Sequence, residues 1–599
     1  MSEYYNPQQE PGSERRLLLV FALTFIVLMV FQPLLTKYLR PGGTAAPETA
    51  KSADARGAIP SNGPLPPAAS VASAGGASAA AVSGASTGEN SVAAVQASAE
   101  AETVIENDLY RITFTNRGGQ VKSWVLKKYQ DERRQPLNLV HPKAVEQNGY
   151  PLSLWSYDES LRKKLNSVLY VSSAAGEQKA PAGITFEYRD AQVHVVKTFQ
   201  FDDSYVVTVK TRVESNGQRV TAYPAWPSGF GDQGSAASYA AGRVEWQQGD
   251  KVERQEAKKI SGGNTVPGPF QWIGVADQYF AAAFMPENPS TASAVTLRSA
   301  IEVPKDAGKA DSQKIRVEIL GIAAGDTNGG TSSRLFVGPK SLNILESVPT
   351  AQAAGQSQPA DLRGLVNFGF FSLIARPLFL WLRWTHDHIV GNWGWAIVCL
   401  TFIINLVLFP LRFSSMKSAM KMQKLQPQLN ALKDKYKKYA ARDPRKAEMN
   451  QEIAALFKRE GANPAGGCLP LVIQMPFLFA FYAMLGSAIE LRHANWLWIR
   501  DLSSPDPLYI IPVFIVASTF AMQRMTPQAG MDPAQQKMMT VMMPVMLGFI
   551  SWSLSAGLGV YWILGNVIGV VQQVVLNRTN FGQEMRELAE KRARQKAAK

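Results

Sequence analysis

Residues 391–411 read GNWGWAIVCLTFIINLVLFPL and carry no charged side chain. A helix that crosses the hydrocarbon of a bilayer needs about 20 consecutive, mostly apolar residues, and this segment supplies them. Further apolar segments follow at residues 469–489, 508–522, 539–554 and 558–576. One span would be enough to tether a protein. Five successive segments therefore predict a bundle of membrane-spanning helices.

Another apolar run lies far upstream, at residues 17–35. The apolar core of a cleaved signal peptide has about 7–15 residues. This longer run therefore predicts an uncleaved signal anchor, preceded by a short cytoplasmic segment at residues 1–16. Residues 36–101 are mostly Ala, Ser, Gly, Pro and Val. Such a composition buries too little apolar surface to offset its ordering entropy, so we expect a flexible linker.

Residues 102–345 differ from both ends of the chain, because short alternating runs recur there between turn signals. Residues 193–201 and 205–213 flank the pair Asp202–Asp203 and form the clearest hairpin pattern. Since helical periodicity is scarce in this region, we predict an antiparallel β-sandwich.

Residues 346–390 lead from this domain to the first span of the bundle. Apolar side chains at 362–384 alternate with Arg363, Arg376 and Arg383. This pattern predicts an interfacial amphipathic helix whose arginines reach toward the lipid headgroups. Packing of the same helix against the bundle is compatible with the pattern as well.

Residues 412–460 hold thirteen Lys/Arg against five Asp/Glu and read as a helical hairpin. Basic loops stay on the cytoplasmic side of a membrane. Alternation of the spans then places residues 36–390 outside and the basic tail 578–599 in the cytoplasm. The sequence thus predicts six spans with both termini in the cytoplasm. The net charge of +14 gathers beside the spans, so nucleic-acid binding is the weaker interpretation, with ribosome contact as its best form.

The sequence contains no GxxxxGK[ST], HExxH or GxSxG motif. Its two cysteines, Cys399 and Cys468, fall in or beside predicted spans and do not suggest a disulfide framework. His386 and His388 are two residues apart and do not share a helix face. We therefore predict neither an enzyme nor a cofactor or metal site.

Uncharged polar side chains recur within the predicted spans at Thr401, Asn405, Gln474, Ser518 and Asn566. Each costs free energy in hydrocarbon unless it is paired or faces water. For any one residue, a hydrogen bond between helices is the simpler explanation. Taken together, they are equally compatible with a polar, hydrated groove.

Five segments of the chain resemble the YidC/Oxa/Alb family of membrane-protein insertases, and they occur in the family's order. They are GNWGWAIVCLTFIINLVLFPL, KMQKLQPQL, NPAGGCLPLVIQMPFLFAFYAML, DPAQQKMMTVMMPVM and LGVYWILGNVIGVVQQ. This resemblance covers residues 362–577. The extra anchor, the large β-domain and the looser motif NRGGQVKSWVLKKY resemble the Gram-negative form. In that form the periplasmic domain is similar to a sugar-mutarotase-like β-sandwich.

The resemblance implies an insertase and chaperone that hydrolyses no nucleotide and works alone or with the Sec translocon. A groove open to the cytoplasm and to lipid, and closed outside, would receive nascent membrane proteins. The residues expected in this groove are Thr401, Asn405, Arg412, Gln474, Ser518, Tyr561 and Asn566. The basic hairpin is expected to contact substrate and ribosomes through Lys417, Lys421, Lys424, Lys433, Lys437 and Lys438.

One position departs from the family. Its members typically have a groove arginine four residues after the threonine of the TF motif, where this chain has Asn405. Arg412 follows seven residues later, roughly 10 Å nearer the cytoplasm on the same face of a continuous helix. We hypothesise that Asn405 keeps the groove wet while Arg412, with Lys417, attracts acidic substrate segments. Alternatively, Arg412 is only an anchor at the cytoplasmic flank.

Two other functions fit parts of the sequence less well. A polytopic transporter with a periplasmic binding domain should show internal repeats or charges within its spans. A periplasmic carbohydrate-active enzyme would need a cluster of histidines and carboxylates, and the β-region offers only His141 and His194 with scattered acids. The insertase is the function that the sequence supports best.

Overall fold

The computed structural model describes residues 94–131, 134–233, 236–304, 313–351, 361–439, 443–461, 469–525 and 533–578. The predicted anchor at residues 17–35 lies outside these ranges. So do most of the predicted linker at 36–101 and nearly all of the basic tail at 578–599.

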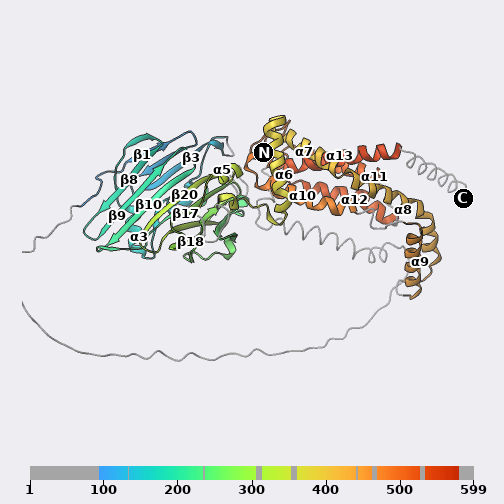
Figure 1. The fold of residues 1–599 in the computed structure, drawn as a ribbon, viewed down its shortest axis with the longest axis horizontal. Coiled ribbons are helices and arrows are strands. Elements are labelled where there is room, and N and C mark those ends of the chain that lie inside the picture. Colours follow the sequence, from blue (N-terminus) through green and yellow to red (C-terminus); the bar gives the residue numbers. More distant parts are fainter. Residues whose placement is uncertain are drawn as a thin grey trace, which may run out of the picture. The chain divides into compact units, whose positions relative to one another are not determined.

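The β-rich region contains three sheets (Figure 1). The largest runs in the order β14 (Lys251–Glu256), β13 (Arg243–Gln248), β16 (Trp272–Ala276), β17 (Phe280–Pro286), β20 (Gly330–Pro339), β10 (Val206–Ser215), β9 (Val193–Phe201), β8 (Ala182–Arg189) and β6 (Val171–Ser172), with β11 (Gln218–Arg219) paired to β10. The second runs β4 (Pro136–Asn138), β3 (Gln120–Gln130), β2 (Tyr110–Thr115), β1 (Glu102–Glu106) and β7 (Gly176–Lys179). The third runs β15 (Thr265–Pro267), β18 (Ala292–Pro304), β19 (Lys314–Asp326), β12 (Tyr223–Trp226) and β5 (Ser153–Trp155).

The predicted β-rich class of this region is confirmed, and the predicted hairpin corresponds to β9 and β10, which pair in antiparallel register from Phe201 opposite Val207. The purely antiparallel arrangement was not fully correct, because β1 pairs with β7 in parallel. Strand β9 buries every second side chain, so its alternation defines the face that packs into the core. Four short helices accompany the strands: α2 (Pro142–Asn148), α3 (Glu159–Ser167), α4 (Ala236–Tyr239) and α5 (Leu342–Glu346).

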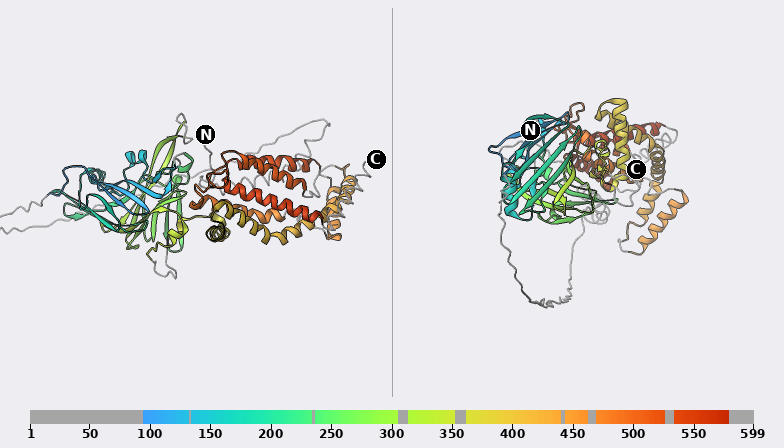
Figure 2. Two further views of the ribbon diagram at one scale, coloured as in Figure 1. Left: turned by 90° about the horizontal axis from the view of Figure 1, so that it is seen from above. Right: turned by 60° about the vertical axis from the view of Figure 1, so that its left-hand side comes forward.

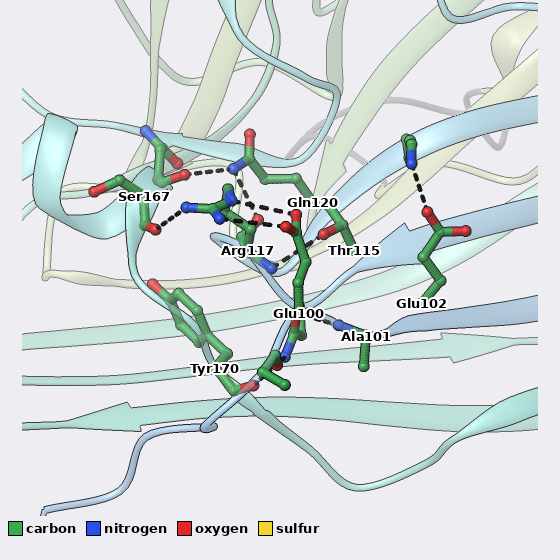
Figure 3. Close-up of polar contacts among 12 residues, drawn as sticks. Glu100, Ala101, Glu102, Thr115, Arg117, Gln120, Ser167 and Tyr170 are labelled. Atoms are coloured by element: carbon green, nitrogen blue, oxygen red, sulfur yellow. Dashed lines mark hydrogen bonds and ion pairs between the residues drawn. The ribbon is translucent and has the colours of Figure 1, made fainter.

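The motif NRGGQ, which begins at Asn116, attaches the segment before β1 to the rest of this domain. The Arg117 guanidinium donates to both carboxylate oxygens of Glu100 at 3.2 Å and to the backbone carbonyl of Ser167 (Figure 3). Asn116 bonds the backbone of Ala99 and Ala101. Together with the bridge from Val95 to β8, these contacts attach residues 95–101 to the β-domain.

The two glycines of the motif allow a turn that few other residues could adopt, with φ of +68° at Gly118 and +52° at Gly119. Their carbonyls accept hydrogen bonds from the ammonium group of Lys197 at 2.9 and 2.6 Å, and Leu152 provides a third acceptor at 2.6 Å. Lys197 is fully buried. Burial lowers its pKa to about 7. The three acceptors favour the charged form, because only an ammonium supplies three N–H donors.

We expect Lys197→Met to lower the free energy of unfolding of the β-domain by about 3 kcal/mol, because three buried carbonyls lose their donor. Urea-dependent pulse proteolysis of the full chain in detergent, scored on fragments of the β-domain, measures this change. The control is Lys122→Met, which removes an exposed ion pair with Glu102 and should cost less than about 1 kcal/mol. Equal losses in the two variants would contradict the role given to Lys197.

The helical region follows residue 361. Its helices are α6 (Ser372–Thr385), α7 (Trp393–Val407), α8 (Phe409–Lys435), α9 (Arg445–Arg459), α10 (Leu469–Ser487), α11 (Ile510–Met525), α12 (Pro533–Ser551) and α13 (Ala556–Arg578). Helix α13 packs beside α7 and α11, and α11 packs beside α12. The left-hand view of Figure 2 shows the helices of this region running side by side. The predicted helical character of this region is confirmed.

The predicted count of six spans is not confirmed. Among the described residues, one helix, Ala556–Val575, is long and apolar enough to cross a membrane by itself. A second candidate arises if residues 369–390 and 393–407, which are bent by 116°, form one span. Helices α11 and the apolar part of α12 are shorter. The expected continuous span at 391–411 is divided at Leu408 into α7 and α8, which begins at Phe409 and has Pro410 in its first turn.

Helix α6 is amphipathic, as the arginine-spaced pattern predicted. One face buries Ala375, Leu378, Phe379 and Leu382, while Leu373 is 88% exposed. Trp381 and Trp384 are exposed as well. One face of this helix therefore packs on protein, and contact of the exposed face with lipid stays a prediction.

Candidate functional site

Arg412 lies in the first turn of α8 and points to the side of α10. One of its guanidinium nitrogens, Nη2, donates to Gln474 Oε1 at 2.5 Å. The other, Nη1, is buried and has no hydrogen-bond partner in the described protein. A methyl group added to Gly569 of α13 would lie 3.7 Å from Nη1, so α13 borders the guanidinium too. Three helices thus enclose a cation with one unused donor nitrogen.

Tyr561 is 2% exposed and belongs to the same group. Its ring stacks on Phe481 of α10 with centroids 4.2 Å apart, and its hydroxyl lies within interaction range of Arg412 and Gln474. The structure therefore brings together Arg412, Gln474 and Tyr561, which the sequence placed far apart on three segments.

Thr401 and Asn405 are buried in α7 and bond mainly to their own helix. The Thr401 hydroxyl donates to the Ile397 carbonyl at 2.6 Å, and Asn405 Nδ2 donates to the Thr401 carbonyl at 2.7 Å. Asn405 Oδ1 is buried and unpartnered in the described protein. Leu408 separates α7 from α8, but its backbone is right-handed helical, and hydrogen bonds from Leu408 N–H to Ile404 and from Arg412 N–H to Leu408 continue across it. That Asn405 and Arg412 share one helix face therefore stays a prediction.

Asn566 of α13 joins α11 through two hydrogen bonds. Its amide Nδ2 donates to Ser518 Oγ at 3.1 Å and to Thr519 Oγ1 at 3.0 Å. For this pair of helices the simpler sequence interpretation, hydrogen bonding between helices, describes the contact.

Unsatisfied polar atoms occur in four helices of the described bundle. Asn405 Oδ1, Arg412 Nη1, Gln523 Oε1 and Gln572 Oε1 are all buried without a protein partner. Each such atom costs about 1–3 kcal/mol unless water or a ligand meets it. The apolar segment predicted at residues 508–522 ended just before Gln523, which lies in α11. The uncharged α11 sequence before Arg524 was the available signal that the helix continues.

The basic hairpin carries the other predicted contact residues. Helices α8 and α9 pack together, and Lys435 and Tyr436 of α8 both bond Glu452 of α9 at about 3 Å. Lys421, Lys437 and Lys438 are exposed, whereas Lys424 and Lys433 are half-buried. The side chain of Lys417 lies outside the described part of the structure.

The loop between α10 and α11 contacts the starts of two other helices, α7 and α13. Trp496 packs on Gly394 of α7 so closely that an added methyl group would lie 2.1 Å from its ring. Asn392, the N-cap of α7, donates to the Asn495 carbonyl. Backbone bonds from Ala556 and Gly557 to Ser504 and Leu502 attach the start of α13. This loop therefore packs against the starts of α7 and α13, and the sequence did not predict these particular contacts.

The two histidines of the β-domain lie in different environments and do not share a site. His141 Nδ1 accepts from the Ala144 backbone at 3.1 Å, so Nε2 carries the proton and faces Tyr239 Oη at 2.5 Å. His194 lies among Glu187, Arg189 and Glu214. The described residues contain no group of three His, Cys, Asp or Glu that could hold a metal ion.

Two family models match the chain: 60Kd inner membrane protein at residues 384–584 and YidC periplasmic domain at residues 102–381. The membrane protein insertase YidC of Syntrophus aciditrophicus is 33% identical over 495 residues, which cover 80% of this chain and 85% of that protein. The chain belongs to the YidC family of inner-membrane proteins. A YidC of Geobacter sulfurreducens is also 33% identical, over 78% of this chain and 85% of that protein. The resemblance found in the sequence is thereby confirmed.

Solved structures give weaker similarity. A crystal structure titled active YidC insertase with the first transmembrane domain resolved has a TM-score of 0.33 and 17% identity, covering 80% of this chain and 95% of that one. A galactose mutarotase-like protein from Lactobacillus casei has a TM-score of 0.25 and 11% identity, covering 40% of this chain and 99% of that one. Membership in the YidC family therefore rests on the sequence relatives.

Gly394→Ala should destabilise the closed end of the helices by about 1–3 kcal/mol, because the new methyl group must displace the Trp496 ring. Thermal unfolding in detergent, followed by the helical circular dichroism signal, measures the effect. At Gly565 an added methyl group would meet its nearest atom at an ordinary 3.8 Å, so Gly565→Ala serves as the control. A melting temperature unchanged in both variants would show that the Trp496 contact is dispensable.

The stability of the β-domain should fall as pH drops from about 6.5 to 4. Burial lowers the pKa of His141 to about 4, so between these values the unfolded state binds one more proton than the folded state. The loss reaches about 1.4 kcal/mol per pH unit, or about 3 kcal/mol in total. Hydrogen exchange of α2 and β18 amides, corrected for intrinsic rates, measures it. His141→Asn, which can still cap α2, should flatten this profile, whereas the surface variant His194→Asn should not.

Proposed function

We propose that this protein inserts membrane proteins into the inner membrane and assists their folding. Membership in a family whose relatives are named membrane protein insertases supports this activity. The observation that carries the proposal for this chain is the enclosed Arg412 guanidinium, held by Gln474 on one nitrogen and unpartnered on the other.

In the proposed mechanism, Arg412, Gln474, Asn405 and Tyr561 line a hydrated groove between helices. The buried polar atoms without protein partners support hydration, because water is the partner that lowers their cost. A polar segment of a client could exchange its own water for this environment instead of entering hydrocarbon. Its apolar segment would move into lipid, a transfer favourable by about 25 cal/mol per Å² of apolar surface.

Arg412 supplies the positive charge in this groove and Gln474 acts as its positioning residue. A carboxylate on the client would meet Nη1, which has no other acceptor among the described residues. The partial burial of the guanidinium between α8, α10 and α13 argues against a purely solvated flank anchor. Asn405, on the preceding helix α7, adds a polar side chain to the groove.

The groove opens to the cytoplasm and to lipid and is closed outside. The loop that joins Trp496 to Gly394 and binds the start of α13 supports closure at that end. The excess of basic residues at 412–460 supports a cytoplasmic position for the opposite end. Both termini would then be cytoplasmic and the β-domain periplasmic.

The α8–α9 hairpin is the proposed contact for nascent chains and ribosomes. Its exposed Lys421, Lys437 and Lys438 would attract acidic or phosphate-bearing surfaces. Cooperation with the Sec translocon is proposed from the sequence resemblance. In this mechanism the insertase requires no cofactor, and the membrane potential acts on charged client segments.

Complementation of an insertase-depleted bacterium tests the proposal, with insertion of a small two-span client that carries an acidic translocated segment as the readout. Wild type should restore insertion. Arg412→Ala should reduce its rate roughly tenfold, as expected for the loss of about 1.4 kcal/mol. Gln474→Ala should reduce it less, and Asn405→Ala should affect acidic and neutral clients alike.

The matched control is Arg524→Ala, which removes an exposed arginine that lies over Phe520 near the end of α11. It should insert the client at the wild-type rate. A second client whose acidic residue is replaced by Asn should lose its sensitivity to Arg412→Ala. Full activity of both Arg412→Ala and Asn405→Ala, at equal protein levels, would refute the groove charge. Failure of well-expressed wild type would count against the activity itself.

A further inference from the structure

The loop between α10 and α11 contains a tight turn that exposes a leucine. Trp496 and Ile499 exchange backbone hydrogen bonds at 2.8 Å in both directions, so Leu497 and Trp498 form the tip of a two-residue turn. Leu497 has a φ of +52° and is 66% exposed. Turns of this kind favour Gly, Asn or Asp, because a leucine side chain is strained at positive φ.

The exposure and the backbone strain of Leu497 together indicate that this tip contacts a partner. A leucine facing water in an unfavourable conformation gains nothing from its side chain, whereas burial of the same side chain would offset the strain. The two backbone groups that close the turn are already bonded to each other. Only the backbone groups of the two tip residues are left for the solvent, and the hydrated headgroup region of a bilayer can still bond them.

The surroundings indicate lipid as that partner. Trp395, which packs edge-on against Trp496, is 48% exposed, and Trp498 is 37% exposed. Trp552, at the turn between α12 and α13, is 51% exposed. Tryptophan is enriched where hydrocarbon meets water, because its ring is apolar and its N–H is polar. Helix α11, which follows this loop, also exposes apolar side chains, among them Val513 and Phe514.

We propose that the Leu497–Trp498 turn inserts into the interfacial region of the bilayer and anchors the closed end of the helices there. Leu497 enters the acyl boundary while Trp498 keeps its indole N–H on Asp506 at 3.3 Å. Because Trp496 is packed on Gly394, the anchor also fixes the depth of α7, the helix that carries Asn405. The inference rests on the membrane location included in the proposed function, but not on insertase activity.

Spin labels in proteoliposomes of phosphatidylethanolamine and phosphatidylglycerol test this proposal without any client. In the full chain carrying Cys399→Ser and Cys468→Ser, single labels are placed through Leu497→Cys, Val571→Cys and Val171→Cys. Val571 is an exposed position of the apolar helix α13, and Val171 is an exposed position of the β-domain. The readout is the ratio of collision rates with oxygen and with a water-soluble nickel complex.

A label at 497 should give a ratio several-fold above that at 171 and approach that at 571, at a depth of about 5–10 Å below the headgroup boundary. A ratio equal to that at 171 would overturn the anchor, and so would shielding from both reagents, which would mean that protein covers the tip. If labelling at 497 unfolds the loop, Leu497→Asn, which tolerates positive φ, provides the second measurement with the label at Trp552→Cys. Loss of lipid exposure at 552 in this variant is expected, and an unchanged ratio would refute the proposal.

Discussion

The cost of burying polar groups shapes this protein at particular sites of both halves. At two sites of the β-domain the cost is offset within the protein. Lys197, with no exposed surface, gives its three N–H donors to three carbonyls, and His141 is matched on both ring nitrogens. Satisfied networks of this kind favour a single rigid arrangement, although other buried polar atoms of the β-domain, such as Trp124 Nε1 and Thr211 Oγ1, have no partner among the described residues.

The helical region leaves part of the same cost open. Among the described residues, Arg412 is matched on Nη2 by Gln474 but not on Nη1, and the side-chain carbonyl oxygens of Asn405, Gln523 and Gln572 have no partner. A rigid scaffold with unused polar groups suits a passage whose contents change, because water or a client can supply the missing bonds. The network around Lys197 gains stability from being closed, whereas the proposed groove depends on an incomplete one.

The sequence predicted much of this organisation through periodicity and charge. Alternating residues at 193–201 and 205–213 predicted the β9–β10 hairpin, and the basic stretch at 412–460 predicted the hairpin of α8 and α9. The break at Leu408, the helical position of Gln523 and the parallel pairing of β1 with β7 were not predicted. The break at Leu408 lies beside Pro410, which has no N–H to continue the helix, whereas the β1–β7 pairing joins strands far apart in the chain.

The sequence by itself determined the apolar segments, the β-rich domain, the basic hairpin and the family, because these follow from local composition and ordered motifs. It also identified Arg412, Gln474 and Tyr561 as candidates. Only the tertiary structure decided that these three meet, that Gly569 leaves room beside the guanidinium, and that Trp496 closes on Gly394. Such contacts join residues far apart in the chain, and their free energy depends on packing geometry that periodicity does not encode.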